Sequence, residues 1–254
     1  MKRLIYLLPV ILLGFSLAGC KTNVHYDAQQ LTAMAVIGLI CILFTVLAIY
    51  SNILRDEISS LEEFNKNAQA QQQQQKWKLV ERTAPFSLTK VQFGLWTVLI
   101  SSAYVYLSLC KGDCAETSIN KTALVLMGIY AGTAVASSVM DKNEIGDNRP
   151  RHQNTPSRGF FLDILSDDNG ISLHRFQNLA WTIIAMTVYL YKVSEVTTGC
   201  LLPELSDTLL ALTGISSATY LVLKSKENDP PVKPLSQASV QTDPKPTLTE
   251  AAAA

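Results

Sequence analysis

The stretch Phe86-Ser-Leu-Thr-Lys-Val-Gln-Phe-Gly-Leu-Trp-Thr97 decides the fold of this chain, because it returns as Ile171-Ser-Leu-His-Arg-Phe-Gln-Asn-Leu-Ala-Trp-Thr182. The copies lie 85 residues apart and share Ser, Leu, a basic residue, Gln, Trp and Thr in the same order. The apolar segments that follow them repeat at an offset of 86, which aligns Gly128 with Gly214. A sequence repeat indicates one structural unit used more than once. We therefore predict two equivalent helical hairpins.

The composition indicates that these hairpins lie in a membrane. Charged residues make up 17% of the 254 residues, the formal net charge is zero, and 48% of the residues are hydrophobic. A chain without a basic excess lacks the electrostatic footprint of a nucleic-acid binder, so we exclude nucleic acid as a partner. Charge is also missing from whole windows of the chain, which is typical of segments that cross a lipid bilayer.

Five such windows contain no Asp, Glu, Lys or Arg, and a span takes about 20 mostly apolar residues. They are 31–50, 91–109, 122–140, 176–191 and 208–223. The last two are short, and polar uncharged flanks or a slightly thinner bilayer would complete them. We expect an all-α membrane protein with about five transmembrane helices. Two parallel-repeated hairpins would form a four-helix bundle, with one N-terminal helix added to it.

Lysine and arginine predict which way the helices face. They are concentrated in 55–90, in 141–175 and after residue 223, whereas the opposite loops hold only Lys111, Lys121 and Lys192. The positive-inside rule places the three basic segments in the cytoplasm. The first span therefore starts outside, and the C-terminus lies inside.

The first residues have the pattern of a secretory signal, in which Lys2 and Arg3 precede the apolar run 4–15. Leu17-Ala18-Gly19-Cys20 follows and resembles the lipobox of bacterial lipoproteins. The resemblance implies cleavage before Cys20, lipidation of Cys20 and a place in the bacterial inner membrane. The alternative is an uncleaved first membrane helix that carries an incidental cysteine.

The repeat and the spans divide the chain into segments. In order they are a signal peptide (1–19), a lipidated N-terminus with the first membrane helix (20–54), a cytoplasmic helix continuing that span with a Gln-rich spacer (55–85), the first hairpin repeat (86–142), a cytoplasmic linker with an interfacial helix (143–170), the second hairpin repeat (171–224) and a disordered cytoplasmic tail (225–254). The acidic residues Asp163, Asp167 and Asp168 lack the ligand spacing of a calcium loop, so we interpret them as a solvated cap and turn.

Two sets of repeated residues are expected to pack helices together. Gln92 and Gln177 each lie four residues before a tryptophan, Trp96 and Trp181, so each pair shares one helix face. A glutamine inside the membrane seeks a partner on another helix. The amides are therefore helix-packing residues, or alternatively the polar lining of a cytoplasmic vestibule.

The returning helices carry the second set, a stripe of small residues. Gly128 and Gly132 form a GxxxG pattern, and Gly214 and Ala218 are aligned with them in the second copy. Small residues four apart let helices approach closely in lipid. We expect these faces to pack on each other or on another subunit.

The cysteines and histidines indicate a disulfide but no catalytic or metal-binding site. Cys114 and Cys200 are equivalent in the repeat and face the oxidising side, which favours a disulfide between them, with Cys110–Cys114 as the alternative. The three histidines are scattered, and no phosphate loop or nucleophile elbow is present. The sequence predicts no catalytic residue, metal or cofactor, so we do not expect an enzyme.

The paired Ser-Leu-x-Lys/Arg-x-Gln…Trp-Thr hairpins over about 86–224 resemble a type of uncharacterised bacterial inner-membrane protein. The resemblance implies a shared architecture and no activity. Our first hypothesis is a scaffold or interaction protein of the inner membrane, which recruits partners through its cytoplasmic segments. The alternative is a small oligomeric channel or transporter subunit. Beyond the lipid bilayer, we expect protein partners or self-association.

Overall fold

The computed structural model describes residues 28–74, 83–110, 118–149, 151–167, 169–196 and 201–228. These residues form seven helices and one two-stranded antiparallel hairpin. The elements are α2 (Ala28–Tyr50), α3 (Leu61–Gln74), α4 (Leu88–Cys110), α5 (Lys121–Gly146), α6 (Phe160–Leu165), β1 (Ser166–Asp167), β2 (Gly170–Ile171), α7 (Leu173–Glu195) and α8 (Asp207–Lys224). The all-α class is confirmed, and each predicted span falls within one of the five long helices.

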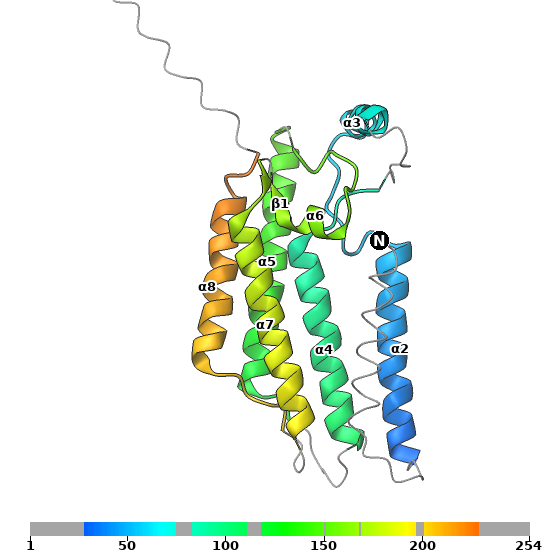
Figure 1. Ribbon diagram of the computed structural model, residues 1–254, viewed down its shortest axis with the longest axis vertical. Helices are drawn as coiled ribbons and strands as arrows, with labels where there is room; N and C mark the ends of the chain where they lie inside the picture. Colours follow the sequence, from blue (N-terminus) through cyan, green and yellow to red (C-terminus); the bar gives the residue numbers. More distant parts are fainter. Residues whose placement is uncertain are drawn as a thin grey trace, which may run out of the picture.

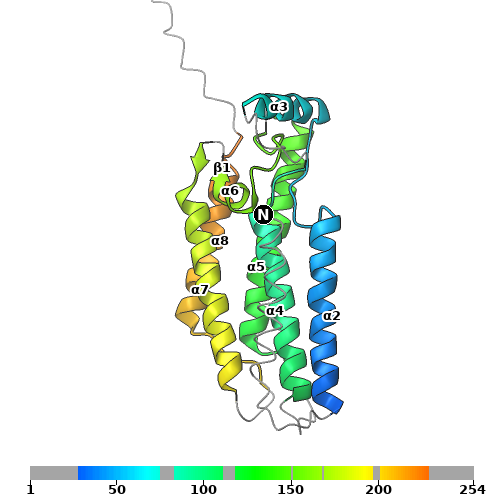
Figure 2. The same cartoon turned by 45° about the vertical axis from the view of Figure 1, so that its right-hand side comes forward.

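The five long helices lie side by side (Figure 1). α4 contacts α5, α5 contacts α8, α8 contacts α7, and α7 returns to α4, while α2 packs against α4 from outside this group (Figure 2). Aromatic side chains fill the centre. The Trp96 ring stacks on the Tyr130 ring, with 5.5 Å between the ring centroids, and it meets the Tyr189 ring edge-on, with 5.9 Å between the centroids. The apolar core continues away from them through Leu107 and Leu126.

Three of the described helices are long and apolar enough to cross a membrane, namely α2, residues 88–109 of α4, and α5. The sequence predicted five. α7 includes His174, Arg175, Lys192 and Glu195, so its uncharged stretch is short. α8 has 18 residues and is therefore about 27 Å long, just under the thickness of a typical hydrocarbon core. Length and composition thus support a membrane protein and separate these two helices from the other three.

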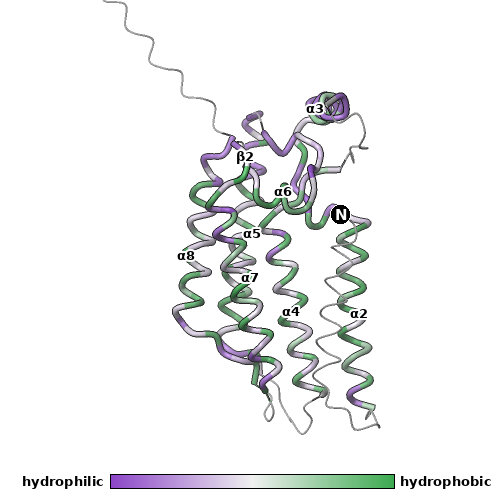
Figure 3. Tube along the Cα trace, viewed as in Figure 1, coloured by the Kyte–Doolittle hydropathy of each residue, from purple (hydrophilic) through white to green (hydrophobic). Residues whose placement is uncertain are grey.

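Polar segments gather at one end of the bundle, where α3, α6 and the β-hairpin lie (Figure 3). The prediction that the first span continues into the following helix is wrong. α2 ends at Tyr50, and the next residues pair with the chain before α4 instead. The Ser87 amide donates to the Leu54 carbonyl at 2.9 Å, and the Asp56 amide donates to Pro85 at 3.0 Å. α3 then starts afresh, and Ser60 caps it by accepting from the Glu63 amide at 3.2 Å.

The segment after α5, expected to be a linker, is packed into this polar end. Arg151, Gln153 and Asn154 are each at most 3% exposed. The Asn154 side chain accepts from the Ser59 amide at 3.0 Å, which joins this segment to the start of α3. Low hydrophobicity misled the prediction, because polar side chains are buried readily when they are paired with one another.

The acidic residues after this segment also differ from the prediction. Asp163 lies in α6 and accepts from the backbone amides of Arg158, at 2.8 Å, and Phe86, at 3.2 Å, so it is not a solvated cap. Burial raises the pKa of Asp163 even though these hydrogen bonds oppose the rise. The turn expected after α6 is present as the β1–β2 hairpin.

Candidate functional site at the polar end of the bundle

We use the name polar head for the described parts of 51–74, 141–172 and 224–228. Its centre is a buried cluster of ion pairs between helix ends. Asp141 and Glu144 are three residues apart and therefore share one face of α5. Arg151 reaches both of them, with Nη2 2.7 Å from Asp141 Oδ1 and Nε 3.0 Å from Glu144 Oε2. Lys224, the last residue of α8, adds an ammonium group 3.1 Å from Asp141 Oδ1.

Asn228 attaches the chain that leaves α8 to this cluster. Its amide nitrogen donates to Glu144 Oε2 at 3.0 Å and to Gln153 Oε1 at 3.2 Å. Its side-chain oxygen accepts from the His152 amide at 3.1 Å. The backbone of Asn228 has φ of 64°, a left-handed conformation that asparagine adopts more readily than most residues. The chain after α8 therefore turns back onto the head.

A second buried ion pair joins the start of α7 to the same segment. Arg175 Nη2 lies 2.6 Å from Glu227 Oε2, and Arg175 Nε lies 3.2 Å from Glu227 Oε1. The guanidinium also lies over the ring of Tyr220, 5.5 Å from its centre. Arg175 is only 3% exposed, so this pair is buried within the head. Its partner could not be inferred, because Glu227 lies 52 residues away.

Asp56 connects the two ion-pair groups electrostatically. Burial by itself would raise the pKa of Asp56, but the positive charge of Lys224 and a hydrogen bond from Ser87, together with further cations, bring the pKa below its usual value. Asp56 therefore stays ionised at neutral pH. Its negative charge offsets part of the positive charge that Arg175 and Lys224 bring into the head.

A polar group continues from the head into the bundle. Gln92 Nε2 donates to Thr182 Oγ1 at 2.7 Å, and the Tyr130 hydroxyl lies 3.0 Å from the same oxygen. The Asn178 side chain is within 3.4 Å of Gln92 Nε2. Gln92 Oε1 and Asn178 Nδ2 have no hydrogen-bond partner among the described residues. Gln92 thus links α4 to α7.

The second copy of the motif presents a different face. On α4 the buried positions include Gln92, Trp96, Leu99 and Ala103, and on α7 they include Asn178, Thr182, Ala185 and Tyr189. These two sets are offset by 86, whereas the Gln-Trp motif repeats at 85. One residue turns a helix face by about 100°. As a result Gln177 is exposed and Trp181 is only half-buried, whereas Gln92 and Trp96 are buried.

The two small-residue stripes do not meet within the chain, so that part of the packing prediction is wrong. Gly128, Gly132 and Ala218 are exposed. A Cβ added at Gly128 or Gly132 would have open space around it, and one at Gly214 would touch Ile129 at 3.6 Å. The buried faces of α5 and α8 instead carry larger or polar side chains. Packing against another subunit is the alternative that stays a prediction.

Several predicted residues lie outside the described part of the chain. They are Cys20, Cys114 and Cys200, together with the side chain of Cys110. The predicted lipidation and both predicted disulfides therefore stay predictions. Cys41 in α2 is buried and free.

The comparisons with known proteins add no identity to this geometry. No family model, no curated protein and no solved structure matches the chain. The resemblance to paired-hairpin membrane proteins therefore stays an expectation from the motif.

Proposed function

We propose that this chain is a non-enzymatic scaffold or interaction protein of the bacterial inner membrane. Five helices would cross the bilayer as two repeated hairpins and one added helix. The polar head would lie in the cytoplasm and hold soluble partners. The single observation that carries the proposal is the buried ionic cluster around Arg151, which unites distant segments into one polar unit at the end of an apolar bundle.

The arrangement of the five long helices supports five crossings of the membrane. All five long helices extend between the same two ends of the molecule (Figures 1 and 2). The charged residues of α7 and α8 lie in their first and last turns, where they can reach the interfaces. Between these turns the outer faces are apolar, with Ile183 and Ile184 exposed on α7 and Ile215 on α8. Exposed isoleucines of this kind suit contact with lipid better than contact with water.

Charge supports a cytoplasmic head. The head and the helix ends beside it hold Arg55, Lys66, Arg149, Arg158 and Lys226 in addition to the buried cations. The segments at the opposite end are much poorer in lysine and arginine, and such an asymmetry places the richer end in the cytoplasm. A lipid-anchored Cys20 outside the membrane agrees with this orientation.

The head offers α3 as a surface for partners. Phe64 and Ala68 are buried beneath it, whereas Glu62, Asn65 and Lys66 are exposed. Asn67 donates to the Asn154 carbonyl at 2.9 Å, and Asn154 in turn donates to Glu63 at 2.7 Å. A helix held in place by such contacts presents its outer face with little loss of conformational entropy on binding.

The proposal is tested by photo-crosslinking in living bacteria. A photoreactive residue at Asn65, on the outer face of α3, should give discrete crosslinked bands to soluble proteins. The matched control is Ile119, which is exposed at the opposite end of the bundle. Arg151→Leu should weaken the Asn65 bands without removing the protein from the membrane. Bands from Ile119 alone, or none from Asn65, would contradict a scaffold that works through its head.

The polar interior favours a second function, a channel or transporter subunit. Among the described residues, Gln92 Oε1 and Asn178 Nδ2 lack hydrogen-bond partners, and so do the hydroxyls of Ser137 and Ser217, as water-lined surfaces would allow. The other half of the bundle is closed by apolar side chains such as Leu126 and Leu210. Ion or solute flux in proteoliposomes that Gln92→Leu reduces and Gln177→Leu leaves unchanged would support this function over the scaffold.

A further inference from the structure

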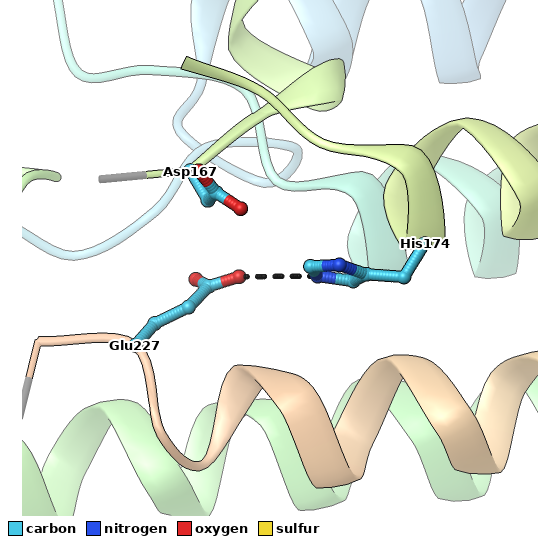
Figure 4. A group of neighbouring side chains, drawn as sticks. All are labelled: Asp167, His174 and Glu227. Atoms are coloured by element: carbon cyan, nitrogen blue, oxygen red, sulfur yellow. Dashed lines mark ion pairs between the residues drawn. The ribbon is translucent and has the colours of Figure 1, made fainter. Parts of the chain in front are cut away.

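We propose that Asp167, His174 and Glu227 bind a divalent transition-metal ion at the edge of the polar head. The three side chains come from β1, from the first turn of α7 and from the segment after α8. One potential ligand atom from each lies within 4.8 Å of the other two. Figure 4 shows the two carboxylates and the imidazole pointing toward one another. Separate segments therefore place an N,O,O donor set around one point.

A neighbouring hydroxyl orients the histidine for this role. Ser172 Oγ lies 2.6 Å from His174 Nδ1 and 3.3 Å from Nε2, so the shorter contact is with Nδ1. The other ring nitrogen, Nε2, lies on the side of Glu227, 3.6 Å from Oε1. Metal-binding histidines are usually held by a polar contact at the nitrogen that does not bind the metal.

The gap between the ring and the glutamate has the width that an ion needs. His174 Nε2 is 3.6 Å from Glu227 Oε1, which is too long for a hydrogen bond. Two ligands at about 2.1 Å from one tetrahedral ion are separated by about 3.4 Å. A small shift of either side chain therefore suffices to bind an ion, and Asp167 would close the third side.

The ion pair with Arg175 leaves one carboxylate oxygen of Glu227 available to a metal ion. Its strong contact is with Oε2, at 2.6 Å, while Oε1 receives only the longer bond from Nε at 3.2 Å. Oε1 can therefore bind an ion while Oε2 keeps the ion pair. Two carboxylates, one guanidinium and a neutral imidazole give this group a net charge of −1, which attracts a divalent cation.

The donor set selects the class of metal. Imidazole nitrogen with carboxylate oxygen suits Zn²⁺, Mn²⁺ and Fe²⁺, whereas Ca²⁺ and Mg²⁺ prefer oxygen ligands throughout. The sequence alone does not reveal these three ligands, because Asp167 and Glu227 lie 60 residues apart. This explains why scattered histidines and an acidic turn did not predict a metal site. A bound ion would fasten the segment after α8 to the β-hairpin and to α7.

The test uses the full chain purified in detergent without a histidine tag and stripped with a chelator. ZnCl₂ and MnCl₂ are titrated separately, with bound metal counted by elemental mass spectrometry after dialysis. We expect one ion per chain, and at least tenfold weaker binding in Asp167→Asn and in His174→Gln. The control is Asp147→Asn, which should bind as the unsubstituted protein does.

A purified, unsubstituted protein that binds no ion would overturn the proposal, whatever the variants do to folding. Binding that Asp147→Asn weakens as much as Asp167→Asn would also refute the site. Absorption of the Co²⁺ form gives a second measurement, since nitrogen and oxygen ligands in a tetrahedral site give intense visible bands. Co²⁺ bands that persist in the His174→Gln protein would likewise refute it. Neither readout depends on partner binding, so the scaffold proposal can fail while this one holds.

Discussion

Lys224 Nζ lies 3.1 Å from Asp141 Oδ1, and both side chains are buried. This pair joins the last residue of α8 to α5, and Arg151 shares the same carboxylate. Two cations on one buried carboxylate would be unfavourable without Glu144, which accepts from Arg151, and Asp56, which lies near Lys224. The pair between Lys224 and Asp141 therefore depends on the charges around it.

Removal of Arg151 should show this dependence. Arg151→Leu leaves Glu144 without its cation in a buried place, and we expect a loss of about 3–5 kcal/mol in the free energy of unfolding. Chemical denaturation in mild detergent, followed by circular dichroism, measures it. Arg149→Leu is the control, because Arg149 pairs with Asp147 at a side chain that is 37% exposed. Equal losses in the two variants would mean that the cluster does not stabilise the head.

The two glutamines of the repeat should behave differently. Gln92→Leu removes the bond to Thr182, and we expect a loss of about 0.5–2 kcal/mol, since hydrogen bonds between membrane helices are of that size. Gln177→Leu should change little, because Gln177 is exposed. Thermal unfolding of both variants in the same detergent gives the comparison. A double-mutant cycle between Gln92 and Thr182 should show coupling. Equal effects at both glutamines would argue that α7 turns the same face inward as α4.

A large side chain at Gly128, in the small-residue stripe of α5, should not destabilise the single chain. Gly128→Leu meets open space, and leucine favours helix over glycine, so stability should stay the same or rise. Gly94→Leu is the contrasting variant, because even a Cβ at Gly94 would lie 2.7 Å from the Phe44 ring on α2. We expect about 1–3 kcal/mol of destabilisation there. Loss of an oligomer in Gly128→Leu, seen by light scattering with the monomer still folded, would place the stripe at a subunit interface.

Topology can be checked with reporters. Green fluorescent protein fused after Ala254 should fluoresce, and alkaline phosphatase fused there should be inactive, because we place that end in the cytoplasm. Phosphatase inserted at Ile119, between α4 and α5, should be active. Active phosphatase after Ala254 would mean an even number of crossings after an outside start, which would exclude the five-span arrangement.

Acid should weaken the head through Asp56. The folded state lowers the pKa of Asp56, so its contribution is present above the ordinary aspartate pKa of 3.8 and disappears as the pH falls through the lower, folded-state value. Asp56→Asn should therefore be less stable than the unsubstituted protein at neutral pH, and the difference should shrink below pH 3.8. Unfolding curves at several pH values measure this. A difference that is constant with pH would show that the charge of Asp56 is not responsible.

The long helices could be predicted from sequence because their signal is local. Uncharged windows and the repeated motif located α2, α4, α5, α7 and α8 to within a few residues at most boundaries. The head could not be predicted, because its contacts are distant in sequence. Arg151 donates to the Glu57 carbonyl 94 residues away, and Asn228 donates to Glu144 84 residues away. Composition alone describes such segments as polar, and polar segments resemble linkers until their partners are known.

The buried face of α7 could not be predicted from the sequence for a related reason. The motif aligns Gln177 with Gln92, yet the side chain that faces Gln92 is Asn178, one residue later. A helix presents whichever face its neighbours bury, and α2 covers α4 while no described helix covers α7 in the same way. Motif residues can therefore match between two copies while their surroundings differ.

The attachment of Glu227 and Asn228 has a mechanical consequence. A pull on the chain beyond residue 228 would reach Glu144 of α5 through Asn228 and Arg175 of α7 through Glu227 before it reached the last turn of α8. The load would be shared between α5 and α7, two helices from different hairpins. Tension on the tail would therefore act on contacts between the hairpins before it acted on the last turn of α8.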